Sequence, residues 1–409
     1  MGETSLSAEM KRIVSSNNPV DIATLAYIWG YPLVIKKRFT DFSTSPNVPT
    51  GPTRGPVNTL VHARNLINAS FTDVVRPNAD TLYSLVYLDL RKESIVLRVP
   101  QISDRYHVLQ FLDAYSNNFF YIGTRTNITS GGSYLITGPN WNGIVPSGMT
   151  QIKPPTNLAT IGGRILVNGP QDVSNVRALQ DKFVLSPLSL FEDGTRNNPV
   201  GTTTSKTTTT IMNTTKKEAP VSPQPSFIPK TGIKIFDEIS KDMVENPPYQ
   251  YDADVLAKFN LIGIGPGLTP SSEETAKANA TTIKEALQSG IEEGEKLIDE
   301  KVRNLGTVVN GWSFNLDTGD YGTDYLLRAA IAKTAHGANS PQEALYPAVF
   351  TDDRGEQLTG SRNYVIHFDK DKIPPVNGFW SISMYNSKDY FVDNPINRYA
   401  IGDRTPGLK

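Results

Sequence analysis

The sequence contains no cysteine among its 409 residues. Disulfide bonds, thiol nucleophiles and cysteine-ligated zinc or iron–sulfur centres are therefore excluded. Basic residues are not in excess either, because 40 lysines and arginines stand against 41 aspartates and glutamates. This balance gives no positive surface of the kind that binds nucleic acid or anionic membrane.

Long apolar runs are absent as well. None approaches the ~20 residues that a membrane-spanning helix needs, and no basic segment followed by an apolar one marks a secretory signal. We therefore expect a soluble protein without a transmembrane segment, and the sequence does not assign it to a compartment.

The common catalytic motifs are missing. There is no nucleophile elbow and no Gly-rich phosphate loop, and Gly263-Ile264-Gly265-Pro266-Gly267 has proline where a dinucleotide-binding helix starts. The four histidines show no zinc-binding spacing. The sequence thus predicts no cofactor, and it leaves open whether the chain is an enzyme.

Calcium is the one metal for which candidates exist. Asp317, Asp320 and Asp324 alternate with glycines in the manner of a calcium loop, but the glutamate at position 12 of an EF-hand loop is missing. We therefore predict no metal site and keep these aspartates only as candidates.

The residue pattern that is present predicts helices first and strands later. Residues 5–41 repeat apolar side chains with helical spacing, and Asn18-Pro19 predicts a break and a new helix start. From about residue 70, short β-branched and aromatic runs separated by turn residues indicate an antiparallel sandwich. The expected strands are 82–88, 94–99, 106–113, 118–122, 133–137 and 161–167. The later helices are expected at 172–183, 233–245 and 271–304, and a second β region is expected from about Trp312.

The length predicts two or three domains. A stretch rich in threonine and proline has too little apolar material to form a core and is typical of a linker. The predicted order is N-terminal helices (1–45), a first β-sandwich (46–195), a linker (196–232), a helical connector (233–306) and a second β-sandwich (307–409).

Several motifs place the chain near a known family. In the first half they are Arg76-Pro77-Asn78-Ala79-Asp80-Thr81-Leu82-Tyr83, Asp104-Arg105-Tyr106 and Asp113-Ala114-Tyr115-Ser116-Asn117. In the second half they are Asp352-Asp353-Arg354-Gly355, Phe379-Trp380-Ser381 and Asn394-Pro395-Ile396-Asn397-Arg398-Tyr399. Residues 21–190 resemble the domain of unknown function numbered 1254, and residues 310–404 resemble its usual companion, numbered 1214. The resemblance implies a mainly β fold with helical segments, in which two jelly-roll-like antiparallel β-sandwiches are joined by helices, and it implies no settled activity.

The resemblance also implies further strands after the Asn-Arg-Tyr motif that this chain does not contain. A sandwich without them has unpaired backbone groups and an open apolar seam. We expect another polypeptide to supply them, either a cleaved tail of the same precursor or a separate chain that adds a strand. The alternative is a chain that is truncated or has merely diverged, with nothing filling the gap, because sheet edges can be protected by other means.

Polar residues gather at two places in the first predicted sandwich. One group lies at a loop-to-strand junction and the other near the end of a strand, where alternate residues share a face. The candidate catalytic residues are Asp80, Asp113 and Tyr115, and the candidate ligand-binding residues are Arg76, Asn78, Tyr83, Gln110 and Asn117. The alternative is structural: Arg76 pairs with Asp80 or Asp113, and the asparagines hold turns.

Two functions fit these features. The first is a structural or interaction protein, for example a virion or cell-surface component, that forms a homo-oligomer or binds a complementing polypeptide. The second is a carbohydrate- or small-molecule-binding protein, or a hydrolase, that uses the Arg/Asp/Tyr pocket. The first is favoured because no catalytic arrangement in the sequence is specific.

Overall fold

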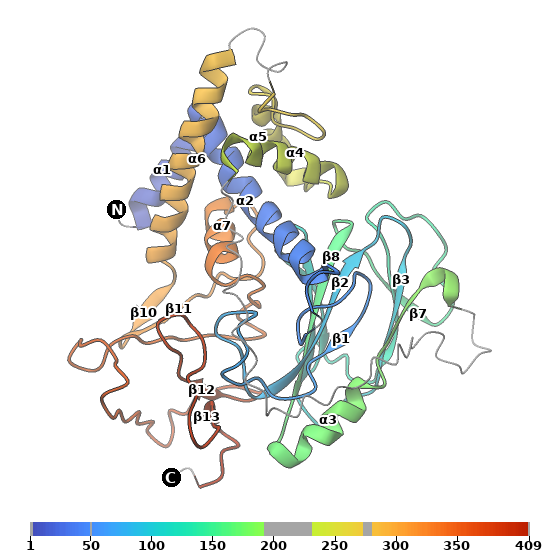
Figure 1. The fold of residues 1–409 in the computed structure, drawn as a ribbon, viewed down its shortest axis with the longest axis vertical. Helices are drawn as coiled ribbons and strands as arrows, with labels where there is room; N and C mark the ends of the chain where they lie inside the picture. The colour runs from blue at the N-terminus through green and yellow to red at the C-terminus, as the bar shows by residue number, and fades with distance from the viewer. Residues whose placement is uncertain (1–2, 50, 192–230, 273–279, 408–409) are drawn as a thin grey trace. The chain divides into compact units, whose positions relative to one another are not determined.

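The fold is that of a computed structural model of the chain (Figure 1). It describes residues 3–49, 51–191, 231–272 and 280–407. Apart from Thr231 and Gly232, the linker predicted at 196–232 lies outside the described residues. Among the described residues, about 31% are helical and 20% are in strands, so the structure is mixed α/β with several antiparallel sheets, and the prediction of a mainly β fold underestimated its helices.

The chain packs as two compact units. Unit 1 comprises Met1–Arg38, Leu112–Phe119 and Ile228–Asn377. Unit 2 comprises Phe39–Phe111, Phe120–Phe227 and Gly378–Lys409. Each unit is therefore assembled from stretches that are far apart in the sequence, and the domain limits given above stay a prediction.

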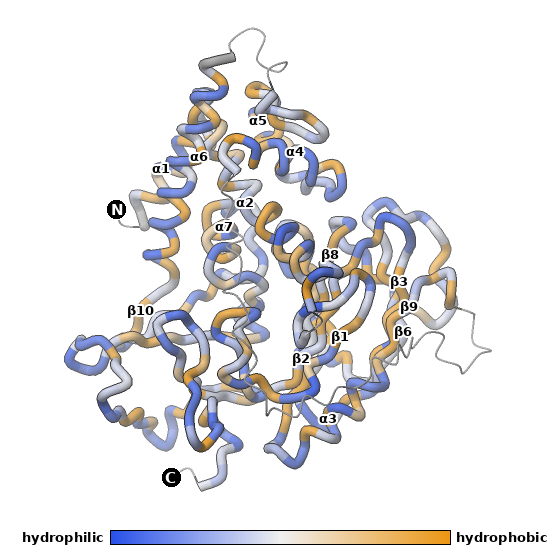
Figure 2. The backbone as a smooth tube through the Cα atoms, in the orientation of Figure 1, coloured by the Kyte–Doolittle hydropathy of each residue, from blue (hydrophilic) through white to orange (hydrophobic). Residues whose placement is uncertain are grey.

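Unit 1 is mainly helical. Its elements are α1 (Glu3–Ser15), the first part of α2 (Pro19–Thr44), α4 (Ile235–Glu245), α5 (Ala253–Asn260), α6 (Ala280–Arg303), α7 (Tyr325–Thr334), the hairpin strands β10 (Thr307–Val309) and β11 (Trp312–Phe314), and the short 3-10 turns Gly232–Lys234 and Gln250–Asp252. The predicted break before Pro19 is confirmed, since the Asn18 side chain accepts a hydrogen bond from Val20 N at 2.9 Å. Hydrophobic and hydrophilic stretches alternate along α6 in Figure 2, as expected for a helix with one buried face.

Helix α7 lies where a continuous second β region was predicted, so that prediction is wrong there. Asp324 caps the helix by accepting a hydrogen bond from Leu327 N at 3.0 Å. Every residue from Tyr325 to Ala332 is buried. A capping aspartate before a run of good helix formers is the signal that identifies this helix in the sequence.

Helices α2 and α6 approach closely through glycine. A Cβ atom placed on Gly290 of α6 would lie 2.5 Å from the Cβ of Ala23 and 2.7 Å from its backbone carbon. One turn further, a Cβ on Gly294 would lie 2.5 Å from the ring of Tyr27. These separations are shorter than real contacts, so glycine sets the distance between the two helices.

Unit 2 holds two sheets and helix α3. One sheet has the order β1-β2-β8-β4-β5 and the other the order β7-β6-β3-β9. The strands are β1 (Val61–His62), β2 (Thr81–Asp89), β3 (Ile95–Val99), β4 (His107–Asp113), β5 (Asn118–Gly123), β6 (Gly132–Ile136), β7 (Met149–Ile152), β8 (Leu158–Leu166) and β9 (Val184–Pro187), and α3 is Val173–Gln180, flanked by the 3-10 turns Pro170–Asp172 and Leu188–Leu190.

The predicted strands of the first half are confirmed as β2, β3, β4, β5, β6 and β8, and the helix at 172–183 is confirmed as α3. Strands β2 and β8 pair antiparallel over nine residues, from Thr81 opposite Leu166 to Asp89 opposite Leu158. The edge strand β7 instead runs parallel to β6. The short strands β7 and β9 were not predicted, because each is only four residues long.

The described residues 378–407 of unit 2 contain the short antiparallel pair β12 (Ser381–Ser383) and β13 (Ala400–Gly402), and an isolated bridge joins Tyr385 to Phe391. No helix in the described part of the chain is long and apolar enough to cross a membrane.

One histidine of unit 1, His336, is half-buried beside a cation, and both nitrogens of its ring are shielded from solvent. Burial, and then the charge of Lys36, lower the pKa of His336 from 6.5 to about 3. The folded unit therefore holds this imidazole neutral at a pH where an unfolded chain protonates it.

We predict that Gly290→Ala destabilises the protein although alanine has the better helix propensity. The added methyl group meets the backbone of Ala23, so α6 has to move away from α2. Urea unfolding is expected to show a loss of about 1–3 kcal/mol. The control is Ser289→Ala at the neighbouring exposed position, where equal destabilisation would contradict the packing argument.

We predict that His336 makes the protein less stable in acid. Its folded pKa lies below its unfolded value, so stability is complete above about pH 6.5 and falls as the pH drops toward 3. The maximum slope is about 1.4 kcal/mol per pH unit. Denaturant unfolding between neutral pH and pH 5 should show a flatter pH dependence for His336→Gln than for the wild type. Equal slopes in the two proteins would refute the assignment.

Candidate functional site

The predicted site residues fall in both units. Asp113, Tyr115 and Asn117 belong to unit 1, whereas Arg76, Asn78, Asp80, Tyr83 and Gln110 belong to unit 2. Each group is therefore described by itself.

In unit 1, the carboxylate of Asp113 shapes the turn that follows β4. Asp113 Oδ1 accepts hydrogen bonds from Tyr115 N at 2.8 Å and from Asn117 N at 2.9 Å. The turn is tight, since Ser116 adopts a left-handed conformation with φ of 69°. Asp113, Tyr115 and Asn117 were expected to share one face of a strand, but Tyr115 and Asn117 lie in this turn instead.

The second carboxylate oxygen of Asp113 faces Tyr249. The Tyr249 hydroxyl donates to Asp113 Oδ2, and Asn117 Nδ2 donates to the same oxygen at 3.3 Å. Asp113 is completely buried. Burial raises the pKa of Asp113, and the hydrogen bonds from Tyr249 and Asn117 oppose that rise.

Tyr249 links this buried carboxyl group to an exposed ring. Tyr249 and Tyr251 stack at 4.8 Å between ring centroids with 12° between their planes. Tyr251 is 46% exposed. Burial, and then the charge of Asp113, raise the pKa of Tyr249, so its hydroxyl stays protonated and acts as a donor.

Tyr115 extends in a different direction from the carboxylate. Its hydroxyl donates to the carbonyl oxygen of Asn246 at 2.8 Å, just after α4. Its ring lies 5.3 Å from the ring of Trp29 in α2. These contacts give Tyr115 a packing role in the present conformation.

Lys36 of α2 is buried in the same unit. Burial lowers the pKa of the Lys36 amine from 10.5 to about 7, and the charge of Asp113 opposes the shift. Unit 1 therefore places a carboxyl group and an amine of altered pKa within electrostatic range of each other.

In unit 2, Asp80 is surrounded by donors. Ser381 Oγ donates to Asp80 Oδ2 at 2.6 Å, and Arg404 Nη2 lies 2.8 Å from Oδ1. Asn78 Nδ2 donates to Oδ2 at 3.2 Å, while Asn78 Oδ1 accepts from Asp80 N at 2.8 Å. We call Asn78, Asp80, Ser381 and Arg404 the Asp80 cluster.

The structural alternative predicted that Arg76 pairs with Asp80 or Asp113, but its partner in the structure is Asp389. Its Nε lies 3.0 Å from Asp389 Oδ1, and its backbone N donates to Asp389 O at 2.8 Å. Arg404 takes the place beside Asp80 that was predicted for Arg76.

Tyr83 and Gln110 also lie inside unit 2. The Tyr83 hydroxyl accepts a hydrogen bond from Asn78 N at 2.9 Å, so it holds the loop before β2. Gln110 is a buried residue of β4. The assignment of these residues to ligand binding stays a prediction.

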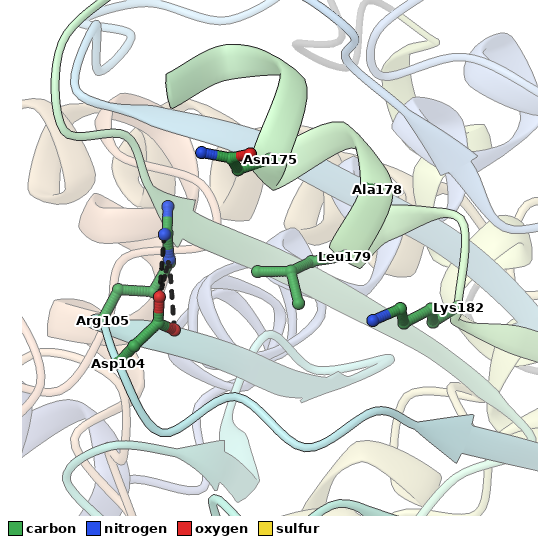
Figure 3. Close-up of a pocket in the computed structure, with 6 residues that line it drawn as sticks. All are labelled: Asp104, Arg105, Asn175, Ala178, Leu179 and Lys182. Carbon is green, nitrogen blue, oxygen red and sulfur yellow. Dashed lines mark hydrogen bonds and ion pairs between the residues drawn. The ribbon is translucent and has the colours of Figure 1, made fainter. Parts of the chain in front are cut away.

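A surface pocket of about 290 Å³ lies beside α3 in unit 2 (Figure 3). It is lined by Asp104, Arg105, Asn175, Ala178, Leu179 and Lys182. The guanidinium of Arg105 is already neutralised, since its Nη2 lies 2.8 Å from Asp104 and its Nη1 lies 2.5 Å from Asp172. The charged lining of the pocket thus consists of the Asp104–Arg105 ion pair and Lys182.

The calcium candidates do not converge. Asp324 caps α7, and Asp317 and Asp320 are exposed. Among the described residues, no group of three or more histidine, aspartate or glutamate side chains is placed to hold a metal ion.

Sequence reasoning missed Arg404, Ser381, Tyr249 and Arg328. Ser381 lay within a recognised motif, but its contact is with a residue 301 positions away. Tyr249 contacts Asp113 over 136 positions. No local pattern reveals such pairs.

Comparison with solved structures supports the fold. The chain is similar to the VPA0106 protein from Vibrio parahaemolyticus, with a TM-score of 0.65, 21% sequence identity, and coverage of 95% of this chain and 84% of that one. A putative uncharacterized protein from Burkholderia cenocepacia matches with a TM-score of 0.22 and 8% identity over 48% of this chain and 51% of that one, which is too low to support an argument. No curated protein matches the sequence.

The family comparison tests the resemblance drawn from the motifs. Residues 57–187 match the model of a protein of unknown function, DUF1254. Residues 343–409 match the model of a second protein of unknown function, DUF1214. The resemblance is therefore confirmed: a region similar to DUF1254 is followed in this chain by a region similar to DUF1214.

Proposed function

We propose that the chain is a structural or interaction protein whose C-terminal β region is completed by another polypeptide. The observation that carries this proposal lies in the described residues 378–407, where the one strand pair joins three residues of β12 to three of β13 and a single further bridge joins Tyr385 to Phe391. A two-stranded ribbon of this length is marginal in water. Its outer edges bind no third strand among the described residues.

Apolar side chains around the ribbon support the same proposal. Met384 is 71% exposed and Ile396 is 66% exposed, and Val392 and Ile401 are exposed as well. A second chain bound at the ribbon would remove exposed apolar side chains of this kind from water.

The proposed binding mode is strand addition. An extended segment would satisfy the edge of β12 or β13 with backbone hydrogen bonds and would cover apolar side chains on one face. The added strands would give the C-terminal region a jelly-roll-like sandwich. The source is a second copy of the chain or a separate complementing polypeptide, as in the assembly of a particle or a cell-surface complex.

The alternative is a small-molecule-binding protein or hydrolase that uses Asp80. The Asp80 carboxylate is already bound by Ser381 and Arg404, and Asn78 adds a further contact. These contacts favour a structural role, because they connect the loop before β2 to residues 378–409 within unit 2.

We predict that the purified protein forms an assembly. Native mass spectrometry should show a multiple of 44.9 kDa, or that mass together with a smaller polypeptide. Ile401→Lys places a charge in the middle of β13 and should shift the species toward a bare chain. Ile144→Lys, at a side chain that is 92% exposed outside the C-terminal region, should leave the assembly intact. A 44.9 kDa monomer for the wild type at all concentrations would refute the proposal.

We predict that Asp80→Asn lowers the free energy of unfolding by about 1–3 kcal/mol. The substitution leaves Arg404 half-paired in a largely buried environment. Arg404→Met should have a similar effect, and the double variant should lose less than the sum because the two side chains act together. Asp403→Asn, which removes the more exposed partner of Arg404, is the control. If Asp80→Asn left stability unchanged or raised it, a functional role for Asp80 would replace the structural one.

A further inference from the structure

Arg328 of α7 is a buried cation whose donors are mostly unsatisfied. Its side chain is 0% exposed. Nη2 donates to the carbonyl oxygen of Trp29 at 3.1 Å, whereas Nε and Nη1 have no hydrogen-bond partner among the described residues. No carboxylate in the described part of the chain forms an ion pair with it. A buried guanidinium group ordinarily has a hydrogen-bond acceptor for each of its nitrogens and a carboxylate as its ion-pair partner.

Two tyrosine rings hold this guanidinium in place. Its Cζ atom lies 5.6 Å from the ring centroid of Tyr115 and 5.3 Å from that of Tyr325. Cation–π attraction reduces the cost of burial. It does not satisfy the N–H groups at the edge of the guanidinium, which need an oxygen acceptor.

Two nearby residues have buried acceptor atoms that lack a hydrogen-bond donor. Asp252 Oδ2 and Asn117 Oδ1 are buried acceptors without a partner. Asp252 is connected to the Arg328 environment by Tyr325, whose hydroxyl donates to Asp252 Oδ1 at 2.8 Å. Asn117 belongs to the same turn as Tyr115. Unit 1 thus combines unused donors on one side chain with unused acceptors on two others.

We propose that Arg328, Asp252 and Asn117 form a binding site for a small hydroxycarboxylate, which we call the Arg328 site. The ligand carboxylate accepts hydrogen bonds from Arg328 Nε or Nη1, a charge-assisted contact that guanidinium forms readily. The ligand hydroxyl donates to Asp252 Oδ2 or Asn117 Oδ1. This orientation keeps the ligand's charge at the cation and directs its neutral end toward the protein carboxylate.

The turn connects this site to the protein surface. Asn117 Nδ2 lies 3.5 Å from the Tyr249 hydroxyl, and Tyr249 stacks on the exposed ring of Tyr251. The two tyrosines therefore lie between solvent and the turn that carries Asn117. Displacement of this pair is the route by which we expect a ligand to enter.

The test compares ligand binding by the full-length wild type and three variants. Arg328→Lys keeps the charge but loses the planar array of donors, and Arg328→Met removes the charge at similar length. Lys333→Met removes a different cation from the same helix, one that pairs with Asp299 at the surface, and serves as the matched control. The probes are the monocarboxylates L-lactate, propionate and acetate at millimolar concentration, measured by titration calorimetry and by thermal unfolding.

We expect L-lactate to bind the wild type and Lys333→Met equally and to raise their melting temperatures. Binding should weaken about ten-fold in Arg328→Lys and be lost in Arg328→Met. Propionate, which lacks the hydroxyl, should bind more weakly than L-lactate.

Two results would overturn the proposal. One is an equal response of the wild type and Arg328→Met to every probe, which would show a general salt effect. The other is no response of the wild type to any probe, which would mean that ordered water alone serves these buried atoms. If Arg328→Met does not fold, the comparison of Arg328→Lys with Lys333→Met decides between the same outcomes.

Discussion

The hydrogen bonding of one buried carboxylate, Asp113, organises much of the interior of unit 1. By accepting from Tyr115 N and Asn117 N, Asp113 fixes a turn that includes Ser116 in a left-handed conformation. The turn places the Tyr115 ring against Trp29 of α2 and beneath the guanidinium of Arg328 of α7. Without the carboxylate, two buried backbone N–H groups would lose their partners, and the contacts with both helices depend on the position of that turn.

Burying so many polar groups in a helical unit has an electrostatic consequence. A low-dielectric interior disfavours charge, which is why the pKa of Asp113 rises while those of Lys36 and His336 fall. Arg328 cannot respond in this way, because a guanidinium stays protonated in proteins. An anionic ligand would therefore stabilise the buried charge of Arg328. The rings of Tyr115 and Tyr325 replace such an anion only in part.

The sequence predicted the strands of the first half well, because β2, β3 and β4 are long runs of β-branched and aromatic residues between clear turn signals. It failed after β11: the motifs there imply a sandwich, whereas the described chain has helix α7 and the short pair β12–β13. The candidate site could be predicted only in part from the sequence, for a different reason. Asp80 and Asp113 were found because they lie in local motifs, but Arg404 and Tyr249 reach them through long-range contacts that spacing does not encode.

The two proposals depend on different physics. In strand addition at residues 378–409, the binding free energy would come from buried apolar surface and from backbone hydrogen bonds at the strand edges. The ion pair of Asp80 and Arg404 would only hold this segment in place. The Arg328 site lies in unit 1 and depends on unsatisfied charge and hydrogen-bonding groups that are already buried. Apolar burial gives affinity for many partners, whereas a buried guanidinium with two matching acceptors discriminates sharply among small ligands, because any ligand that leaves one of these groups unpaired loses a buried hydrogen bond. Specificity for a small molecule is therefore expected from unit 1, whichever polypeptide covers the C-terminal ribbon of unit 2.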